Sequence, residues 1–158
     1  MMLMSIRPKY AYQILSGAKK YELRRRLTFV PYGTRVIIYA SGNVKAIVGE
    51  LKAGRKYTMS LNLLWDLVKD SAGVSKAEFD KYFKGCHAGV ALEILDPVTY
   101  KEPILLETIR EVLRDPKWCP PISYCFISEN HPLARLIDKF AVPARDKSVS
   151  QLSLIHIS

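Results

Sequence analysis

Residues 17–24 read GAKKYELR, and in this stretch a helix stop leads directly into a strand with a charged face. Gly17 sits where a residue in the left-handed conformation commonly ends a helix. From residue 21 to residue 26 apolar and charged side chains alternate, which is the period-two pattern of a half-buried strand. The charged side chains on one face of this strand, with the lysine at the junction, are Glu22, Arg24, Arg26 and Lys19.

These side chains suit an anionic ligand. Lys19 offers a point charge to a phosphate, and Arg24 can bind one with two parallel hydrogen bonds. Glu22 can orient those cations or accept hydrogen bonds from a base or sugar, and once desolvated it can move a proton. The competing interpretation is a solvated strand face with Glu22 paired to Arg24 or Lys20. Spacing alone leaves both interpretations open.

The segments around this stretch predict a helix followed by strands. Helical spacing of apolar residues, with proline in the first turn, predicts a helix over residues 8–16. The β-branched run at residues 35–40 predicts a buried strand, and residues 44–51 predict a second strand antiparallel to it. The sequences at 31–34 and 41–43 are typical of turns.

The remainder of the chain mixes helices and short strands. Helices are expected at residues 61–68, 76–83 and 132–140, the second with a capping box between Ser75 and Glu78. Strands are expected at residues 87–95, closed by Asp96-Pro97, at 103–106 and at 123–127. The pattern at residues 107–114 fits a strand or one to two helical turns.

The sum predicts an α+β fold: a small, mixed, mainly antiparallel β-barrel of five or six strands, with three or four helices in the connections. The length of 158 residues suits one domain, which we assign to residues 1–140. We expect residues 141–158 to be a disordered tail, and residues 148–158 have the character of a non-native extension.

Charge is concentrated in the first third of the chain. Residues 1–60 hold 12 basic and two acidic side chains, a net charge of +10, whereas residues 61–158 have a net charge of −1. A field of this kind favours an anionic partner such as nucleic acid, a nucleotide or an acidic surface. A basic face without a specific ligand is the alternative.

Other features narrow the class of protein. No apolar run is long enough for a transmembrane helix. Three cysteines form no disulfide framework and have no zinc-ligand spacing, so we predict no metal site and a cytoplasmic setting. There is no Gly-rich nucleotide loop, and we expect no cofactor, no membrane partner and a monomer.

The sequence resembles the ASCH domain family of the PUA-like superfamily. Gly17-x-Lys19-x-x-Glu22-x-Arg24 matches the family motif G-x-K-x-x-E-x-R, and residues 5–17 resemble the family's first helix. The later blocks that resemble the family, in the same order, are residues 39–49, 79–85 and 120–124. The resemblance covers roughly residues 2–140.

The resemblance implies a small barrel with a cleft between barrel and helices, lined by the motif residues, and a role in RNA binding for most members. It also implies an enzymatic branch that hydrolyses N4-acylated cytidines with a Lys, a Thr and a Glu, and further members proposed as ribonucleases. Lys19 matches that lysine, the threonine position is Glu22, and Asp70 or Glu78 lies in the region of the third carboxylate.

Three functions stay open on this basis. The first is an RNA- or nucleotide-binding module in RNA metabolism or the regulation of transcription or translation, with Tyr39 or Tyr124 stacking a base. The second is an enzyme that uses Lys19 and Glu22 on a modified nucleoside or on RNA, and the third is a scaffold for an acidic protein. The complete set of predicted ligand-binding residues is Lys9, Lys19, Glu22, Arg24, Arg26, Tyr39, Ser41, Ser123 and Tyr124.

Overall fold

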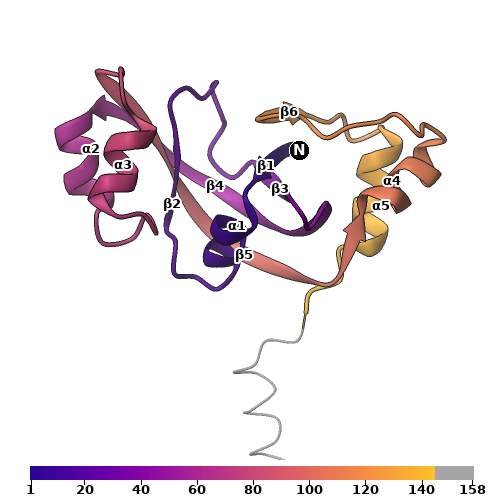
Figure 1. Ribbon diagram of the computed structural model, residues 1–158. Helices are drawn as coiled ribbons and strands as arrows, with labels where there is room; N and C mark the ends of the chain where they lie inside the picture. Colours follow the sequence, from indigo (N-terminus) through magenta and orange to yellow (C-terminus); the bar gives the residue numbers. More distant parts are fainter. Residues whose placement is uncertain (145–158) are drawn as a thin grey trace, which may run out of the picture.

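The fold is a strongly curled six-stranded sheet with helices on both sides, and the computed structural model describes it for residues 1–144 (Figure 1). The strands run in the order β2-β5-β4-β3-β1-β6 across the sheet. Only the β1–β3 pair is parallel among the described residues, and every other neighbouring pair is antiparallel. The predicted α+β class and the mixed, mainly antiparallel sheet are confirmed.

The elements follow the predicted order with several changes of extent. The strands are β1 (Met2–Ile6), β2 (Tyr21–Arg24), β3 (Arg35–Ala40), β4 (Ala46–Ser60), β5 (Ala88–Leu105) and β6 (Tyr124–Phe126). The helices are α1 (Pro8–Leu15), α2 (Leu61–Val68), α3 (Lys76–Tyr82), α4 (Leu106–Leu113) and α5 (Pro132–Phe140). The described residues thus hold five helices rather than three or four, because most of the undecided stretch at residues 107–114 belongs to helix α4.

Two strand predictions were wrong for identifiable reasons. The N-terminal strand β1 was missed, because its five residues are almost all buried and carry no alternation of apolar and polar side chains. Asp96-Pro97 was expected to end a strand, yet β5 continues through it. The sheet register shifts between the pairs Glu50–Val98 and Lys52–Leu95. Asp96 and Pro97 lie at this shift and form a bulge that bends β5.

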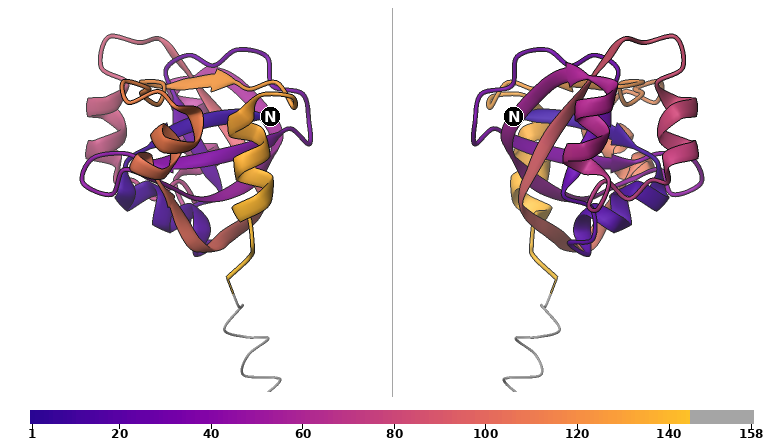
Figure 2. Two further views of the ribbon diagram at one scale, coloured as in Figure 1. Left: turned by 90° about the vertical axis from the view of Figure 1, so that its right-hand side faces the viewer. Right: turned by 90° about the vertical axis from the view of Figure 1, so that its left-hand side faces the viewer.

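Alternation along the strands divides the core. Met2, Met4 and Ile6 of β1 point into the concave interior of the sheet, which α1 fills with Ala11 and Ile14. Leu3, which lies between Met2 and Met4, faces outward and packs with residues of α4 and α5, while Leu23 of β2 and Ala91 of β5 pack on α2 and α3. Figure 2 shows these two helix pairs on opposite sides of the sheet.

The end of the described chain stays against the sheet. Pro143 bridges Tyr100 of β5, and the amide of Ala144 donates to the carbonyl of Thr99. The described part of the domain therefore reaches beyond the predicted boundary at residue 140. The predictions for the tail beyond Ala144, at residues 145–158, lie outside the described residues.

None of the described helices has the length and hydropathy needed to cross a membrane.

Candidate functional site

The two edges of the curled sheet, β2 and β6, approach each other without pairing, and a cleft of about 630 Å³ lies beside this seam. Its floor carries Lys19, Glu22 and Arg24 of the motif. The local sequence places them there: Gly17, at φ 83°, ends α1 and turns the chain into β2. Leu23 then faces the helices, so its neighbours Glu22 and Arg24 face the cleft.

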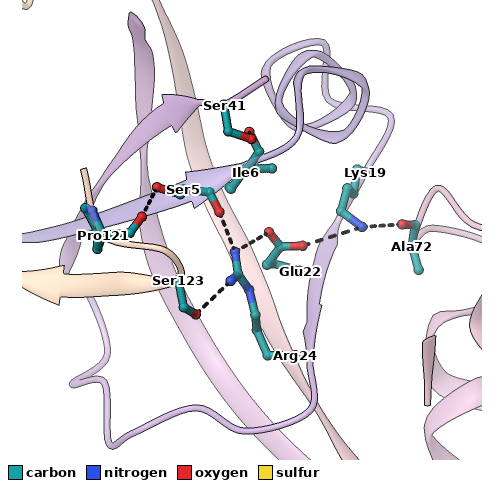
Figure 3. Close-up of polar contacts among 9 residues, drawn as sticks. All are labelled: Ser5, Ile6, Lys19, Glu22, Arg24, Ser41, Ala72, Pro121 and Ser123. Atoms are coloured by element: carbon teal, nitrogen blue, oxygen red, sulfur yellow. Dashed lines mark hydrogen bonds and ion pairs between the residues drawn. The ribbon is translucent and has the colours of Figure 1, made fainter. Parts of the chain in front are cut away.

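Lys19 is buried at this floor, with only 2% of its surface exposed. Its ammonium donates to the carbonyl oxygen of Ala72 in the α2–α3 connection, and its Nζ lies 3.9 Å from Glu22 Oε1 (Figure 3). The Nζ also lies 5.1 Å from the centre of the Tyr10 ring. Burial lowers the pKa of the Lys19 ammonium, with Glu22 opposing that shift and Arg24 adding to it.

Glu22 links the two cations. It is 6% exposed and accepts a hydrogen bond from Arg24 Nη2 at 3.3 Å through Oε2, while Oε1 faces Lys19. The buried carboxylate of Glu22 thus lies between two cations, Arg24 and Lys19. The expected pairing of Glu22 with Arg24 is therefore present, and it forms in a buried site rather than on a solvated strand face.

Arg24 spans the seam between the two sheet edges. Its Nη1 donates to Ser123 Oγ at 3.0 Å, and its Nη2 donates to the Ser5 carbonyl at 3.1 Å as well as to Glu22 (Figure 3). Both terminal nitrogens are therefore engaged with the protein. The arrangement favours a positioning role for Arg24 over the predicted two-bond grip on a phosphate.

Three basic side chains lie at the rim of the cleft. Arg7, Arg25 and Lys81 line it, are exposed, and have no ion-pair partner within residues 1–144. Glu78 also lines the cleft, but its carboxylate closes the capping box with Ser75 and lies 3.6 Å from Lys9. Hydrogen bonds from Ser75 keep the pKa of Glu78 below its usual value.

The predicted residues divide into two groups. Lys19, Glu22, Arg24 and Ser41 line the cleft, and Ser123 reaches it through its bond to Arg24. Ser41 Oγ donates to the Ile6 carbonyl at 3.3 Å, so this side chain also stabilises the turn in which it lies. Lys9 is exposed beside Glu78 and is not part of the cleft wall.

Three predicted residues lie elsewhere. Arg26 is exposed outside the cleft, because β2 ends at Arg24 and the alternation expected to reach residue 26 is lost. Tyr39 is 3% exposed and packs in the core beneath α4 and α5. Tyr124 packs against the interior core, and its hydroxyl accepts from the amide of Thr28, so neither tyrosine is placed to stack a base.

Wall residues that sequence reasoning missed include Arg7, Tyr10, Arg25, Lys81, Tyr82 and Ile122. The basic run at residues 24–26 pointed to Arg25 as a possible ligand contact. The alternation expected along the strand, however, placed its side chain on the face opposite to Arg24 and Arg26. Asp70, one of two carboxylates considered for the site, is exposed and does not line the cleft. Within residues 1–144, no three His, Cys, Asp or Glu side chains cluster as metal ligands would.

Comparison with known proteins identifies relatives in sequence and in fold. No protein-family model matches the chain. The ASCH domain-containing ribonuclease of Zymomonas mobilis is 29% identical over 110 residues, which cover 70% of this chain and 74% of that protein. The crystal structure of the ASCH protein from Zymomonas mobilis superposes with a TM-score of 0.77 at 27% identity, covering 87% of this chain and 93% of that one.

The chain is therefore similar to the ASCH domain proteins in both sequence and fold. A variant of the Zymomonas mobilis protein with one tyrosine replaced by phenylalanine has also been crystallised, and it gives the same TM-score at 26% identity, over 87% of this chain and 96% of that one. In this chain the residues Gly17, Lys19, Glu22 and Arg24 each have a distinct structural role. The glycine ends α1, Lys19 and Glu22 form the buried pair, and Arg24 holds the carboxylate and the seam.

Proposed function

We propose that this protein binds RNA in the cleft and cleaves its phosphodiester backbone. The observation that carries the proposal is the buried Lys19–Glu22 pair, 3.9 Å apart, beneath rim cations that have no ion-pair partner within residues 1–144. The relative named a ribonuclease, at 29% identity, supports the choice of RNA as the anion.

The rim supplies binding and the floor supplies chemistry. Arg7, Arg25 and Lys81 attract the phosphates of the strand, and this part of the affinity falls with added salt because counterions compete. Phosphate contacts hold the strand in place but read no sequence. The strand thereby brings one of its linkages toward Lys19.

Lys19 acts as the proton acceptor and then as the proton donor. Because burial lowers its pKa, a larger share of the amine is neutral near neutral pH than for an exposed lysine. The neutral amine takes the proton of a ribose 2′-hydroxyl, and the oxygen bonds to the adjacent phosphorus. The bond from phosphorus to the 5′-oxygen breaks, and Lys19 returns the proton to that oxygen. The products are a 2′,3′-cyclic phosphate and a 5′-hydroxyl end.

Glu22 and Arg24 set the position of this amine. The Glu22 carboxylate fixes the direction of the Lys19 chain and stabilises its charged form, which opposes the effect of burial. Arg24 holds Glu22 from the other side. The pair therefore keeps the lysine pKa between that of a free ammonium and that of a fully desolvated one.

A second candidate is hydrolysis of the amide in N4-acylated cytidine. It is favoured by one observation, that Glu78 and Lys19 line the same cleft. Glu78 is engaged by Ser75, Tyr10 and Lys9, and Glu22 occupies the position where this branch has threonine. The structure thus supports RNA cleavage better than amide hydrolysis.

The test is a titration of labelled single-stranded RNA at two salt concentrations, with the same protein samples incubated with RNA and with N4-acetylcytidine and the products separated by chromatography. We expect salt-sensitive binding, shortened RNA with cyclic phosphate ends, and intact N4-acetylcytidine. Cytidine released without RNA cleavage would establish the second candidate. Binding of every polyanion alike with no product would instead indicate the protein scaffold.

A further inference from the structure

Arg25 and Tyr82 form a stacked pair on the wall of the cleft. The guanidinium carbon of Arg25 lies over the Tyr82 ring, 4.9 Å from its centre. Arg25 Nε also donates to the backbone carbonyl of Tyr82 at 2.6 Å. Two contacts of different kinds therefore hold the guanidinium over the ring, although both residues lie at the surface.

The ring itself is anchored to the core. Tyr82 is 37% exposed and packs edge-on against Phe83, with ring centres 4.8 Å apart. Phe83 is 1% exposed and packs in turn against the buried Phe79, with the two rings tilted at 55°. An aromatic side chain held in this way loses little conformational freedom when a ligand binds to it.

On the cleft side, the Arg25–Tyr82 pair has a guanidinium face and hydrogen-bond donors that are available to a ligand. One face of the Arg25 guanidinium covers Tyr82, and the opposite face belongs to a side chain that lines the cleft and is exposed. Among residues 1–144, the two terminal nitrogens of Arg25 have no hydrogen-bond or ion-pair partner. Ile122, whose side chain is fully exposed, also lines this cleft and adds an apolar contact surface.

We propose that the free face of the Arg25 guanidinium, backed by Tyr82, is a stacking platform for an unpaired nucleobase of the bound RNA. Bases of single-stranded RNA stack on arginine planes and aromatic rings, whereas paired bases keep their faces inside the duplex. The assignment rests on the proposed function and adds a binding subsite to it. It also replaces Tyr39 and Tyr124 as the source of base stacking.

The test pairs protein variants with RNAs that lack one base. Short uridine oligomers, each with a single abasic ribose at a different position, are titrated against the wild type, Arg25→Lys and Tyr82→Leu. Arg25→Lys keeps the positive charge but removes the planar guanidinium group. Tyr82→Leu keeps an apolar side chain but removes the aromatic ring. Arg26→Lys and Tyr12→Leu, both exposed outside the cleft, are the matched controls. Thermal unfolding checks that each variant folds.

For the wild type we expect removal of the base at one position to weaken binding about 5- to 150-fold, the range for one stacked base. Arg25→Lys and Tyr82→Leu should bind the intact oligomer more weakly than the wild type does. Removal of the base at that position should then weaken their binding much less, whereas the control variants should respond to base removal as the wild type does. If both variants respond to base removal as the wild type does, the platform is wrong but the RNA cleft stands. If the wild type binds none of the oligomers, the platform and the proposed function both fall.

Discussion

Arg24 of β2 donates through Nη1 to Ser123 Oγ at 3.0 Å, across 99 residues of sequence, and this bond joins the two unpaired edges of the sheet. Arg24 also reaches the carbonyl of Ser5, whose own hydroxyl donates to Pro121. The half-barrel is thus closed at this point by one side chain instead of a strand ladder. The same guanidinium orients Glu22, so the seam and the cleft floor are mechanically linked.

Replacing Ser123 should therefore weaken the fold and disturb the cleft. Ser123→Ala leaves Arg24 Nη1 without its acceptor, and we expect the free energy of unfolding to fall by about 1–2 kcal/mol in urea denaturation. Ser60→Ala is the control, because Ser60 is exposed and its side chain makes no capping bond. Equal stability of the two variants would show that the seam is held by other contacts.

A second network lies away from the cleft and secures α5 to the sheet. Glu50 accepts from Arg35 at 2.8 and 2.9 Å and from the Tyr100 hydroxyl at 2.7 Å, and Arg35 also pairs with Asp138 of α5. Burial raises the pKa of Glu50, but the hydrogen bonds from Arg35 and Tyr100 outweigh it, so the net pKa is lowered. Burial together with the bond to Glu50 raises the pKa of Tyr100.

The sign of the resulting pH dependence follows from this lowered pKa. A carboxylate with a folded pKa below its usual 4.5 stabilises the fold above that pH, and the contribution is lost as the pH falls through the folded pKa. At neutral pH we expect Glu50→Gln to lose about 2–3 kcal/mol of unfolding free energy. Its deficit relative to the wild type should shrink in acid. Glu129→Gln, at an exposed position, should match the wild type throughout.

Gly89 allows β5 to approach the aromatic cluster behind Tyr82. A β-carbon at this position would overlap the ring of Phe83 and the side chain of Leu64. We expect Gly89→Ala to lower the free energy of unfolding by about 1–3 kcal/mol, the usual cost of overpacking. Phe83→Leu in the same chain makes room for the methyl group, so the double variant should be more stable than the sum of the single losses. Strict additivity of the two changes would contradict this packing account.

Lys19 gives the fold a pH dependence that an exposed lysine with an unshifted pKa does not give. Its folded pKa lies below the usual 10.5, so the folded state holds fewer protons than the unfolded state between these values. Stability should therefore rise with pH across that interval, relative to Lys19→Met, which has no charge to desolvate. Lys20→Met is the control, since Lys20 is exposed. Parallel stability curves for the wild type and Lys19→Met would contradict the burial argument.

The fold was largely predictable because its signals are local. Gly17 does end α1, Ser75 and Glu78 do form the capping box of α3, and Pro132–Phe140 forms the last helix as expected. Strand β1 was not predicted, because a short strand that is buried on both faces shows no alternation of apolar and polar residues. The bend at Asp96-Pro97 was mistaken for an end because a bulge and a turn have the same local composition.

The site was predictable only where the chain itself brings residues together. Lys19, Glu22 and Arg24 share one short segment, so their common cleft followed from strand alternation. Tyr82 and Ile122 reach the cleft through tertiary packing of α3 and the β6 entry, which no local pattern encodes. Arg25 and Arg26 exchanged their expected places because the strand stops at Arg24.

The most direct test of the central claim is the single-turnover cleavage rate of one labelled single-stranded RNA by the wild type, Lys19→Gln and Lys20→Gln. Lys19 is the buried floor residue and Lys20 its exposed neighbour outside the cleft, so both variants lose one charge but only one loses the reacting amine. We predict that Lys19→Gln still binds RNA but cleaves it at least about 100-fold more slowly, in line with loss of a general base. Lys20→Gln should cleave like the wild type, and cleavage by Lys19→Gln at the wild-type rate would contradict the account.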